Sequence, residues 1–208
     1  HITRIYRESY GIYACNGILF NHESPLRGLE FVTRKISNSV AKIKLGLQKK
    51  LYLGNLDAKR DWGYAPEYVE AMWRVMQYKH PEDFVIATGE THSVREFVQE
   101  AFASVGLNWK DYVIEDVRLR RPLDVHQLCG NPGKARRVLG WKTKTTFKQL
   151  VHIMVQADLK RWEMYLSGKI FPWDAPNYSH EMDIVSRNVV RDTQLKRKNS
   201  WLKLVGGR

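Results

Sequence analysis

A short polar segment, Asn21 to Pro25 (NHESP), places four different chemical groups in consecutive positions. It offers an amide, an imidazole, a carboxylate and a hydroxyl, and Arg27 adds a guanidinium two residues later. The segment follows an apolar run from Ile12 to Phe20, a pattern typical of a buried strand that opens into a loop. Because open α/β sheets bind ligands at the carboxyl ends of their strands, the segment predicts a binding loop. The alternative is a polar turn with an Asx-type cap.

Two arginines are candidates for binding a phosphorylated ligand. Arg60 and Arg121 each lie in a predicted loop that follows a strand. A guanidinium can bind phosphate oxygens bidentately, which the single ammonium of lysine cannot do. Taken alone, each arginine is better explained by a surface ion pair.

Five longer motifs occur in one order along the chain. They are NHESP, FVTRKI (31–36), LGNLDAKRDWGYA (53–65), FVIATGETHSVREF (84–97) and RRP (120–122). Together they resemble the C-terminal part of the GDP-mannose 4,6-dehydratases, which belong to the extended short-chain dehydrogenase/reductase superfamily. The resemblance covers about residues 2–159. It implies an α/β fold, consisting of an incomplete Rossmann-type sheet and the smaller substrate-binding region.

The resemblance also implies roles for eight residues. The residues implied to bind GDP-mannose are Asn21, Arg60 and Arg121 at the diphosphate, Val32 and Lys35 at the guanine, and Asp124 at the ribose. The residues implied to bind NADP are His22 near the nicotinamide and Arg27 near the phosphates. Asp124 stands where the family carries Glu, His126 where it carries Asp, and Leu26 where it carries Arg. These departures imply altered substrate contacts or relaxed selection.

The family's catalytic groups are absent from this sequence. No Gly-rich dinucleotide-binding turn (G-x-G-x-x-G) occurs, and the family's Tyr-x-x-x-Lys, Thr and Glu would lie upstream of His1. The resemblance therefore implies that this chain is the substrate-binding half of a lyase that converts GDP-mannose to GDP-4-keto-6-deoxymannose. It also implies that the chain is inactive alone. Its partners would be the Rossmann half, which holds most of the NADP, and further copies in a homo-oligomer. The alternatives are a sibling GDP-hexose dehydratase or reductase, and a non-catalytic remnant that acts as an interaction module.

Composition limits the other classes of function. The net charge of +12 favours a polyanionic partner, but no nucleic-acid-binding motif is present, and a solvated basic surface explains the charge equally well. No apolar stretch reaches the ~20 residues of a membrane span, and no signal peptide is visible. Cys15 and Cys129 are too few for a disulfide framework or a metal site, and Cys15 is expected to be buried. We expect a cytoplasmic protein.

Hydrophobic periodicity predicts alternating helices and strands. We expect strands at 51–53, 84–87 and 112–117, and helices over 31–45, from Pro66, after Ser93 and from about Thr146. The apolar faces expected to be buried are Val69, Met72, Trp73 and Met76 in the second helix, Val94, Phe97, Val98, Ala101 and Phe102 in the third, and Phe147, Leu150, Val151 and Met154 in the fourth. Trp141 could be a packing residue or a lid.

Two expectations concern the borders of this fold. Half of a doubly wound sheet leaves strand edges and an apolar face exposed, so we expect the chain to self-associate. Residues 1–159 form the nucleotide-sugar-binding part. Residues 160–208 form a basic extension that is partly docked or mobile, with the charged run Lys196 to Lys198 near its end.

Overall fold

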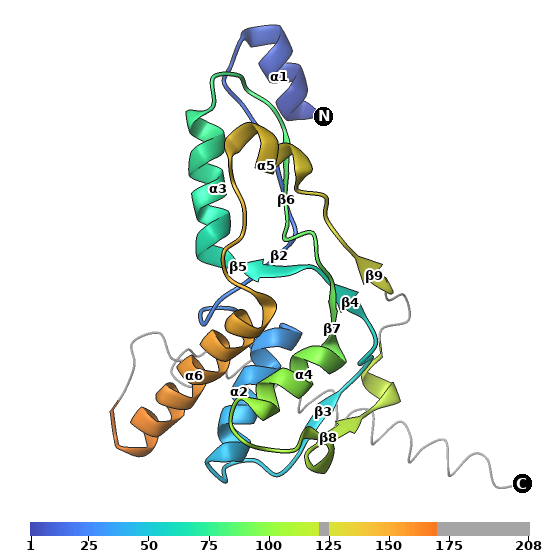
Figure 1. The fold of residues 1–208 in the computed structure, drawn as a ribbon, viewed down its shortest axis with the longest axis vertical. Helices are drawn as coiled ribbons and strands as arrows, with labels where there is room; N and C mark the ends of the chain where they lie inside the picture. The colour runs from blue at the N-terminus through green and yellow to red at the C-terminus, as the bar shows by residue number, and fades with distance from the viewer. Residues whose placement is uncertain (121–124, 170–208) are drawn as a thin grey trace, which may run out of the picture. The chain divides into compact units, whose positions relative to one another are not determined.

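The computed structural model describes residues 1–120 and 125–169. Helices and short strands alternate along this part of the chain, and nearly all strand pairs are parallel, which confirms the expected α/β class (Figure 1). The helices are α1 (Ile2–Tyr10), α2 (Val32–Lys44), α3 (Ala65–Gln77), α4 (Val94–Ala103), α5 (Gly133–Leu139) and α6 (Phe147–Leu166), with 3₁₀ turns at Trp109–Asp111 and Val117–Leu119. The strands are β1 (Gly17–Leu19), β2 (Asn21–Glu23), β3 (Leu51–Leu53), β4 (Lys59–Arg60), β5 (Trp62–Tyr64), β6 (Phe84–Ile86), β7 (His92–Ser93), β8 (Val113–Glu115) and β9 (Gln127–Leu128).

The strands form four small sheets in the described residues. Three are parallel pairs, β1 with β6, β2 with β5 and β3 with β8. In the fourth sheet, β4 lies between β7, which is antiparallel to it, and β9, which is parallel to it. Each pair joins two strands that are far apart in the sequence. The strand pairing therefore determines which loops lie next to one another.

The first strand is shorter than its apolar run suggested. The run from Ile12 to Phe20 predicted one buried strand, whereas β1 covers only Gly17–Leu19 and Ile12 is exposed. A strand needs a hydrogen-bonded neighbour, and β6 supplies one over three residues only. Cys15, expected to be buried, is half-buried for the same reason.

Two separate cores hold the described elements. The larger joins α2, α4 and α6 with β3, and its fully buried members include Ile36, Val40, Phe97, Phe102 and Met154. Figure 1 shows α2 and α4 side by side, with α6 next to α2. The smaller core packs α3 and α5 against β6.

Helix α4 follows its sequence signature closely. The Ser93 hydroxyl accepts from the Glu96 N–H at 3.1 Å, and the Glu96 carboxylate accepts from the Ser93 N–H at 2.6 Å. This reciprocal capping box satisfies two N–H groups that a helix start would otherwise leave unpaired. All five apolar residues expected on its inner face are buried. In α6, Leu150, Val151 and Met154 are buried as expected, and Phe147 is half-buried.

Helix α3 buries a different face from the one we expected. It starts beside Pro66 as predicted, but its buried residues are Tyr68, Ala71 and Val75. The residues predicted to be inside are exposed: Val69 by 61%, Met72 by 43%, Trp73 by 62% and Met76 by 57%. Both faces of this helix carry apolar side chains, so periodicity alone could not select between them, and packing against β6 and α5 decides. Helix α3 thus exposes a stripe of apolar side chains, and self-association stays a prediction.

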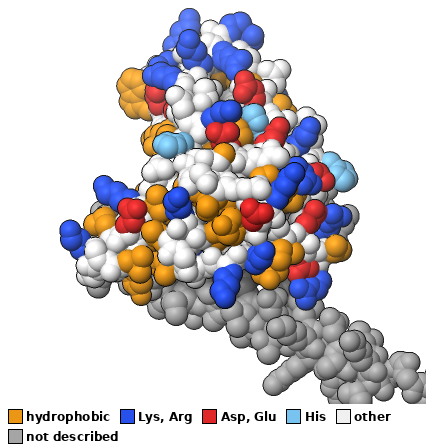
Figure 2. Space-filling view, turned by 60° about the horizontal axis from the view of Figure 1, so that its bottom comes forward, with side chains coloured by type: hydrophobic (Ala, Val, Ile, Leu, Met, Phe, Trp, Pro, Cys, Tyr) orange, Lys and Arg blue, Asp and Glu red, His pale blue; other side chains and the backbone are white. Residues whose placement is uncertain are grey.

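The surface carries its charge in a dispersed way. Figure 2 shows Lys and Arg side chains scattered over one face, with Asp and Glu among them, rather than gathered in one stripe. No helix within the described residues is long and apolar enough to cross a membrane. Helix α6 ends at Leu166, and the structure describes the extension as far as residue 169. The rest of the extension, including the charged run Lys196 to Lys198, lies outside the described residues.

Candidate functional site

The polar segment is partly strand rather than loop. Asn21, His22 and Glu23 form β2, held in parallel register against Trp62, Gly63 and Tyr64 of β5. The predicted loop therefore begins at Ser24, where the turn is closed by the Ser24 hydroxyl, which accepts from the Leu26 N–H at 3.1 Å. This turn is capped by a serine rather than an Asx residue, and its role as a binding loop stays a prediction.

His22 is fixed by its neighbours on two sides. Its Nδ1 lies 2.9 Å from the carbonyl oxygen of Phe20, and its ring stacks on Tyr68 with 5.3 Å between centroids. The ring is half-buried. Because the carbonyl can only accept, Nδ1 carries the proton when the ring is neutral, and Nε2 is then the acceptor.

Glu23 and Arg27 form a local pair beneath the loop. Glu23 is buried, accepts from the Thr33 hydroxyl at 2.5 Å, and lies 3.3 Å from Arg27 Nε. Burial raises the pKa of the Glu23 carboxyl, while the Thr33 hydroxyl and the Arg27 charge act against that rise. The Arg27 guanidinium lies over the Phe31 ring, 3.5 Å from its centroid. Arg27 is thus held as a cation at the loop surface.

Val32 and Lys35 lie in the first turn of α2, directly after this loop. Val32 is half-buried. The Lys35 ammonium donates to the carbonyl oxygen of Tyr52 at 2.8 Å, which holds the side chain over the end of β3. The structure therefore brings five of the eight predicted residues, from Asn21 to Lys35, into one continuous strand–loop–helix unit.

Arg60 lies on a neighbouring strand. It pairs with His92 of β7 and Leu128 of β9 and comes two residues before Trp62, the register partner of Asn21. Its Nη1 donates to the carbonyl oxygens of Lys59 at 2.8 Å and Val125 at 2.6 Å. The latter bond ties Arg60 to the segment that follows the RRP motif. Arg121 and Asp124, the remaining predicted residues, lie outside the described residues.

A buried carboxylate, which no local motif indicates, lies next to Arg60. Asp61 is fully buried and accepts four hydrogen bonds, from the Thr88 N–H and hydroxyl, the Gly89 N–H and the Gly130 N–H, at 2.7–3.2 Å. It thereby joins the loop after β6 to the loop after β9. A Cβ at Gly130 would clash with Ala87, so glycine is needed for this approach. The donors are far apart in the chain, which is why sequence inspection missed the role of Asp61.

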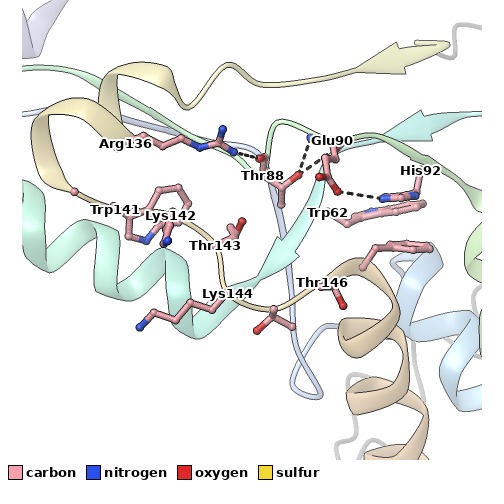
Figure 3. Close-up of a pocket in the computed structure, with 13 residues that line it drawn as sticks. Trp62, Thr88, Glu90, His92, Arg136, Trp141, Lys142, Thr143, Lys144 and Thr146 are labelled. Atoms are coloured by element: carbon pink, nitrogen blue, oxygen red, sulfur yellow. Dashed lines mark hydrogen bonds and ion pairs between the residues drawn. The ribbon is translucent and has the colours of Figure 1, made fainter.

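A cavity of about 440 Å³ lies behind the site strands. Figure 3 shows Trp62 and His92 at one end, with Arg136, Trp141 and Lys142 at the other. Arg136 donates to the Thr88 carbonyl at 2.7 Å, and the His92 ring stacks on Phe147 at 3.8 Å between centroids. None of the described residues predicted to bind substrate or cofactor lines this cavity. Its walls mix acid, base, hydroxyl and aromatic groups and select no ligand class.

Trp141 is a packing residue and not a lid. It is 1% exposed, meets the Tyr68 ring edge-on at 5.8 Å, and donates its indole N–H to the Glu67 carbonyl at 2.8 Å. Because Tyr68 also stacks on His22, this indole supports the back of the site.

Comparison with known proteins decides the family. The family model described as GDP-mannose 4,6 dehydratase matches residues 1–154. The chain belongs to the GDP-mannose 4,6-dehydratase family. It is 57% identical over 155 residues to GDP-mannose 4,6 dehydratase 1 of Arabidopsis thaliana, covering 74% of this chain and 43% of that protein. It is 52% identical over 172 residues to the human GDP-mannose 4,6 dehydratase, covering 74% and 46%. The chain thus spans less than half the length of these relatives.

Two solved structures share the fold of this chain. RMD from Pseudomonas aeruginosa, in complex with NADPH, has a TM-score of 0.69 and 19% identity, over 77% of this chain and 52% of that one. The dTDP-glucose 4,6-dehydratase of Bacillus anthracis, in complex with NAD, has a TM-score of 0.66 and 22% identity, over 78% and 50%. At these identities the likeness shows the fold alone. It agrees with the incomplete Rossmann-type arrangement expected for a dehydratase-family chain.

Proposed function

We propose that this chain is the nucleotide-sugar-binding part of a GDP-mannose 4,6-dehydratase. The observation that carries the proposal is the match of the dehydratase family model to residues 1–154. The pairing of the site strands supports it. Asn21 of β2 pairs with Trp62 of β5, and Trp62 follows Arg60 and Asp61 in the chain. The segments that carry Asn21 and Arg60 are therefore neighbours. The alternative is a sibling GDP-hexose dehydratase or reductase, which would have the same arrangement of strands and loops and a different sugar pocket.

In this proposal the substrate lies across the 21–35 unit and Arg60. Asn21, Arg60 and Arg121 bind the diphosphate, since amide and guanidinium donors suit its charged oxygens. Val32 and Lys35 contact the guanine, and the Tyr52 carbonyl already orients the Lys35 ammonium. Asp124 binds the ribose through a carboxylate one methylene shorter than the family's Glu.

The loop also suits a nicotinamide cofactor, which we propose to be NADP. The Nε of Arg27 is buried against Glu23 at 3.3 Å, so in this proposal the other guanidinium nitrogens are the ones that meet a cofactor phosphate. His22 has Nδ1 committed to a carbonyl, so Nε2 is the nitrogen for a ligand at the nicotinamide end. Bound at this loop, the cofactor would supply the acceptor and donor of hydride for the sugar. Binding and orienting its ring and phosphates is the part that His22 and Arg27 play.

The proton-transfer chemistry belongs to the rest of the enzyme. In the proposed reaction C4 of the mannosyl group is oxidised, the C5 proton and the C6 hydroxyl leave as water, and hydride returns to C6. The general acid and base for these steps would be supplied by the dinucleotide-binding half. Positioning by this chain lowers the entropic cost of the reaction but does not replace a general base.

The partners in the proposal are that half and further copies of the complete enzyme. The exposed stripe of α3 supports a partner here, because a patch of large apolar side chains is a common interaction surface. The same stripe would serve a non-catalytic interaction module. Both cysteines are free thiols, which suits the reducing cytoplasm that we propose as its setting.

A complementation assay tests the proposed function. The chain would be incubated with GDP-mannose and NADP alone, and then together with the unmatched N-terminal half of the Arabidopsis relative. We expect no 4-keto product from the chain alone and product from the mixture. Arg60→Ala in the mixture should lower the yield. Turnover by the chain alone at a rate typical of an enzyme would contradict the division of labour proposed here.

A further inference from the structure

A buried ion pair connects α6 to the site from behind. Asp158 is 1% exposed, and both of its oxygens accept from Arg34 Nε, at 2.9 and 3.0 Å. The Ser37 hydroxyl donates to the same carboxylate at 2.5 Å and Arg161 at 2.9 Å. Burial raises the pKa of the Asp158 carboxyl, and these donors oppose the rise. The carboxylate is thus closely surrounded by donors from α2 and α6.

The other end of the Arg34 guanidinium reaches the site loop. Its Nη1 donates to the carbonyl oxygen of Pro25 at 2.6 Å and to that of Arg27 at 2.9 Å. Both carbonyls belong to residues 24–28, which we call the 24–28 loop. One planar group therefore joins a carboxylate of α6 to two backbone positions of the loop that presents Arg27.

We propose that Arg34 and Asp158 are positioning residues for ligand binding, with Asp158 orienting Arg34 and Arg34 bracing the 24–28 loop. The inference rests on the proposed function for its ligand, and on the contacts above for its mechanism. Neither residue was among the eight that the sequence singled out. Their separation of 124 positions hides the pair from any local motif.

The brace depends on the shape of arginine. A guanidinium presents five N–H donors in a fixed plane, so it can serve Asp158 on one edge and two carbonyls on another. A lysine keeps the positive charge, but its single ammonium cannot span both sets of acceptors. Arg34→Lys therefore preserves the charge opposite Asp158 and removes the brace.

A second arginine in the chain provides a matched control. Arg74 pairs with Glu70 through Nε and Nη2, at 3.0 and 2.6 Å, and its Nη1 donates to the carbonyls of Leu139 and Gly140 at 2.9 and 3.1 Å. Like Arg34, it joins a carboxylate to two backbone carbonyls through Nη1, but it is one third exposed and braces the end of α5 instead of the 24–28 loop. Arg74→Lys thus matches the chemical change at a different place.

The test measures GDP affinity and local cleavage in the full chain, at a temperature where each variant is folded. We expect Arg34→Lys to weaken GDP binding at least fivefold, and Arg74→Lys to leave it within twofold. Limited trypsinolysis, read by mass spectrometry, should show faster cleavage at Arg27–Gly28 in Arg34→Lys, relative to the Arg95–Glu96 bond, which lies within α4 and is cleaved only when that helix unfolds. The ratio separates local loosening of the loop from global unfolding.

A milder variant covers the case in which Arg34→Lys fails to fold. Ser37→Ala removes one donor to Asp158 and should shift both readouts in the same direction by a smaller amount. Equal effects of Arg34→Lys and Arg74→Lys, or unchanged readouts in Ser37→Ala and Arg34→Lys, would overturn the proposal. If the unmodified chain binds no GDP, the proposed function fails. The cleavage ratio then still decides whether the brace exists.

Discussion

Replacing Trp73 with serine is expected to weaken self-association of the chain while leaving its fold intact. Trp73 is 62% exposed on α3 and lies beside Val69 and Met76 on the same face. An aromatic side chain of about 150–250 Å² exposed to this degree leaves on the order of 100–150 Å² to be covered by a partner. At about 25 cal/mol per Å², that area corresponds to roughly 2.5–4 kcal/mol as an upper limit.

The fold should tolerate the change. Tryptophan and serine have similar helix propensities, and exposed substitutions usually change stability by less than about 0.5 kcal/mol. Sedimentation velocity over a concentration series would measure association, and urea unfolding would measure stability. Val117→Ser is the control, because Val117 is 71% exposed but lies outside α3. Its association should match that of the unmodified chain. A loss of more than about 1 kcal/mol in Trp73→Ser would show that the indole packs inside, as its sequence periodicity suggested.

Two further predictions concern single contacts. The Arg7 guanidinium and the Asn16 N–H, at 2.9 and 2.8 Å, hold the pKa of the Asp83 carboxyl well below its usual range. Ionised Asp83 therefore stabilises the fold above about pH 4, and this contribution is lost as the pH falls toward the lower pKa of the folded state. Asp83→Asn should lower stability at pH 7 and flatten its decline below about pH 4 in urea unfolding; an unchanged pH profile would refute the pairing. Trp141→Phe should cost roughly 1–3 kcal/mol in the same assay, because it removes the hydrogen bond from the indole to the partly buried Glu67 carbonyl and shrinks a fully buried side chain; a cost near zero would mean that water replaces the indole.

Local signals in the sequence predicted local structure well. The Ser93–Glu96 capping box and the apolar spacing behind it fixed the start and inner face of α4, because both depend on residues within one or two turns. The choice of face in α3 failed, because it depends on what β6 and α5 present to the helix. The extent of β1 failed for a similar reason, since its partner strand determines where pairing ends.

The same distinction between local signals and tertiary contacts applies to the residues of the candidate site. The 21–35 unit was found because its residues are consecutive and carry family motifs. Asp61 and the pair of Arg34 with Asp158 were missed, because their partners come from distant loops and helices. Their burial and hydrogen bonds become visible only in three dimensions. The roles of Arg121 and Asp124, which lie outside the described residues, stay predictions.

The most direct test of the account is a calorimetric titration of the chain with GDP, UDP and ADP. The account predicts that GDP binds most tightly, through Val32 and Lys35. It also predicts that Arg121→Ala weakens GDP binding by about 1.5–3 kcal/mol, or roughly 10- to 150-fold. Arg118→Ala is the control, because Arg118 is committed to Asp116 at 2.5 Å and should leave the affinity unchanged. Equal affinity for the three nucleotides, or for the Arg121→Ala and unmodified chains, would contradict the claim that this chain is a GDP-sugar-binding half.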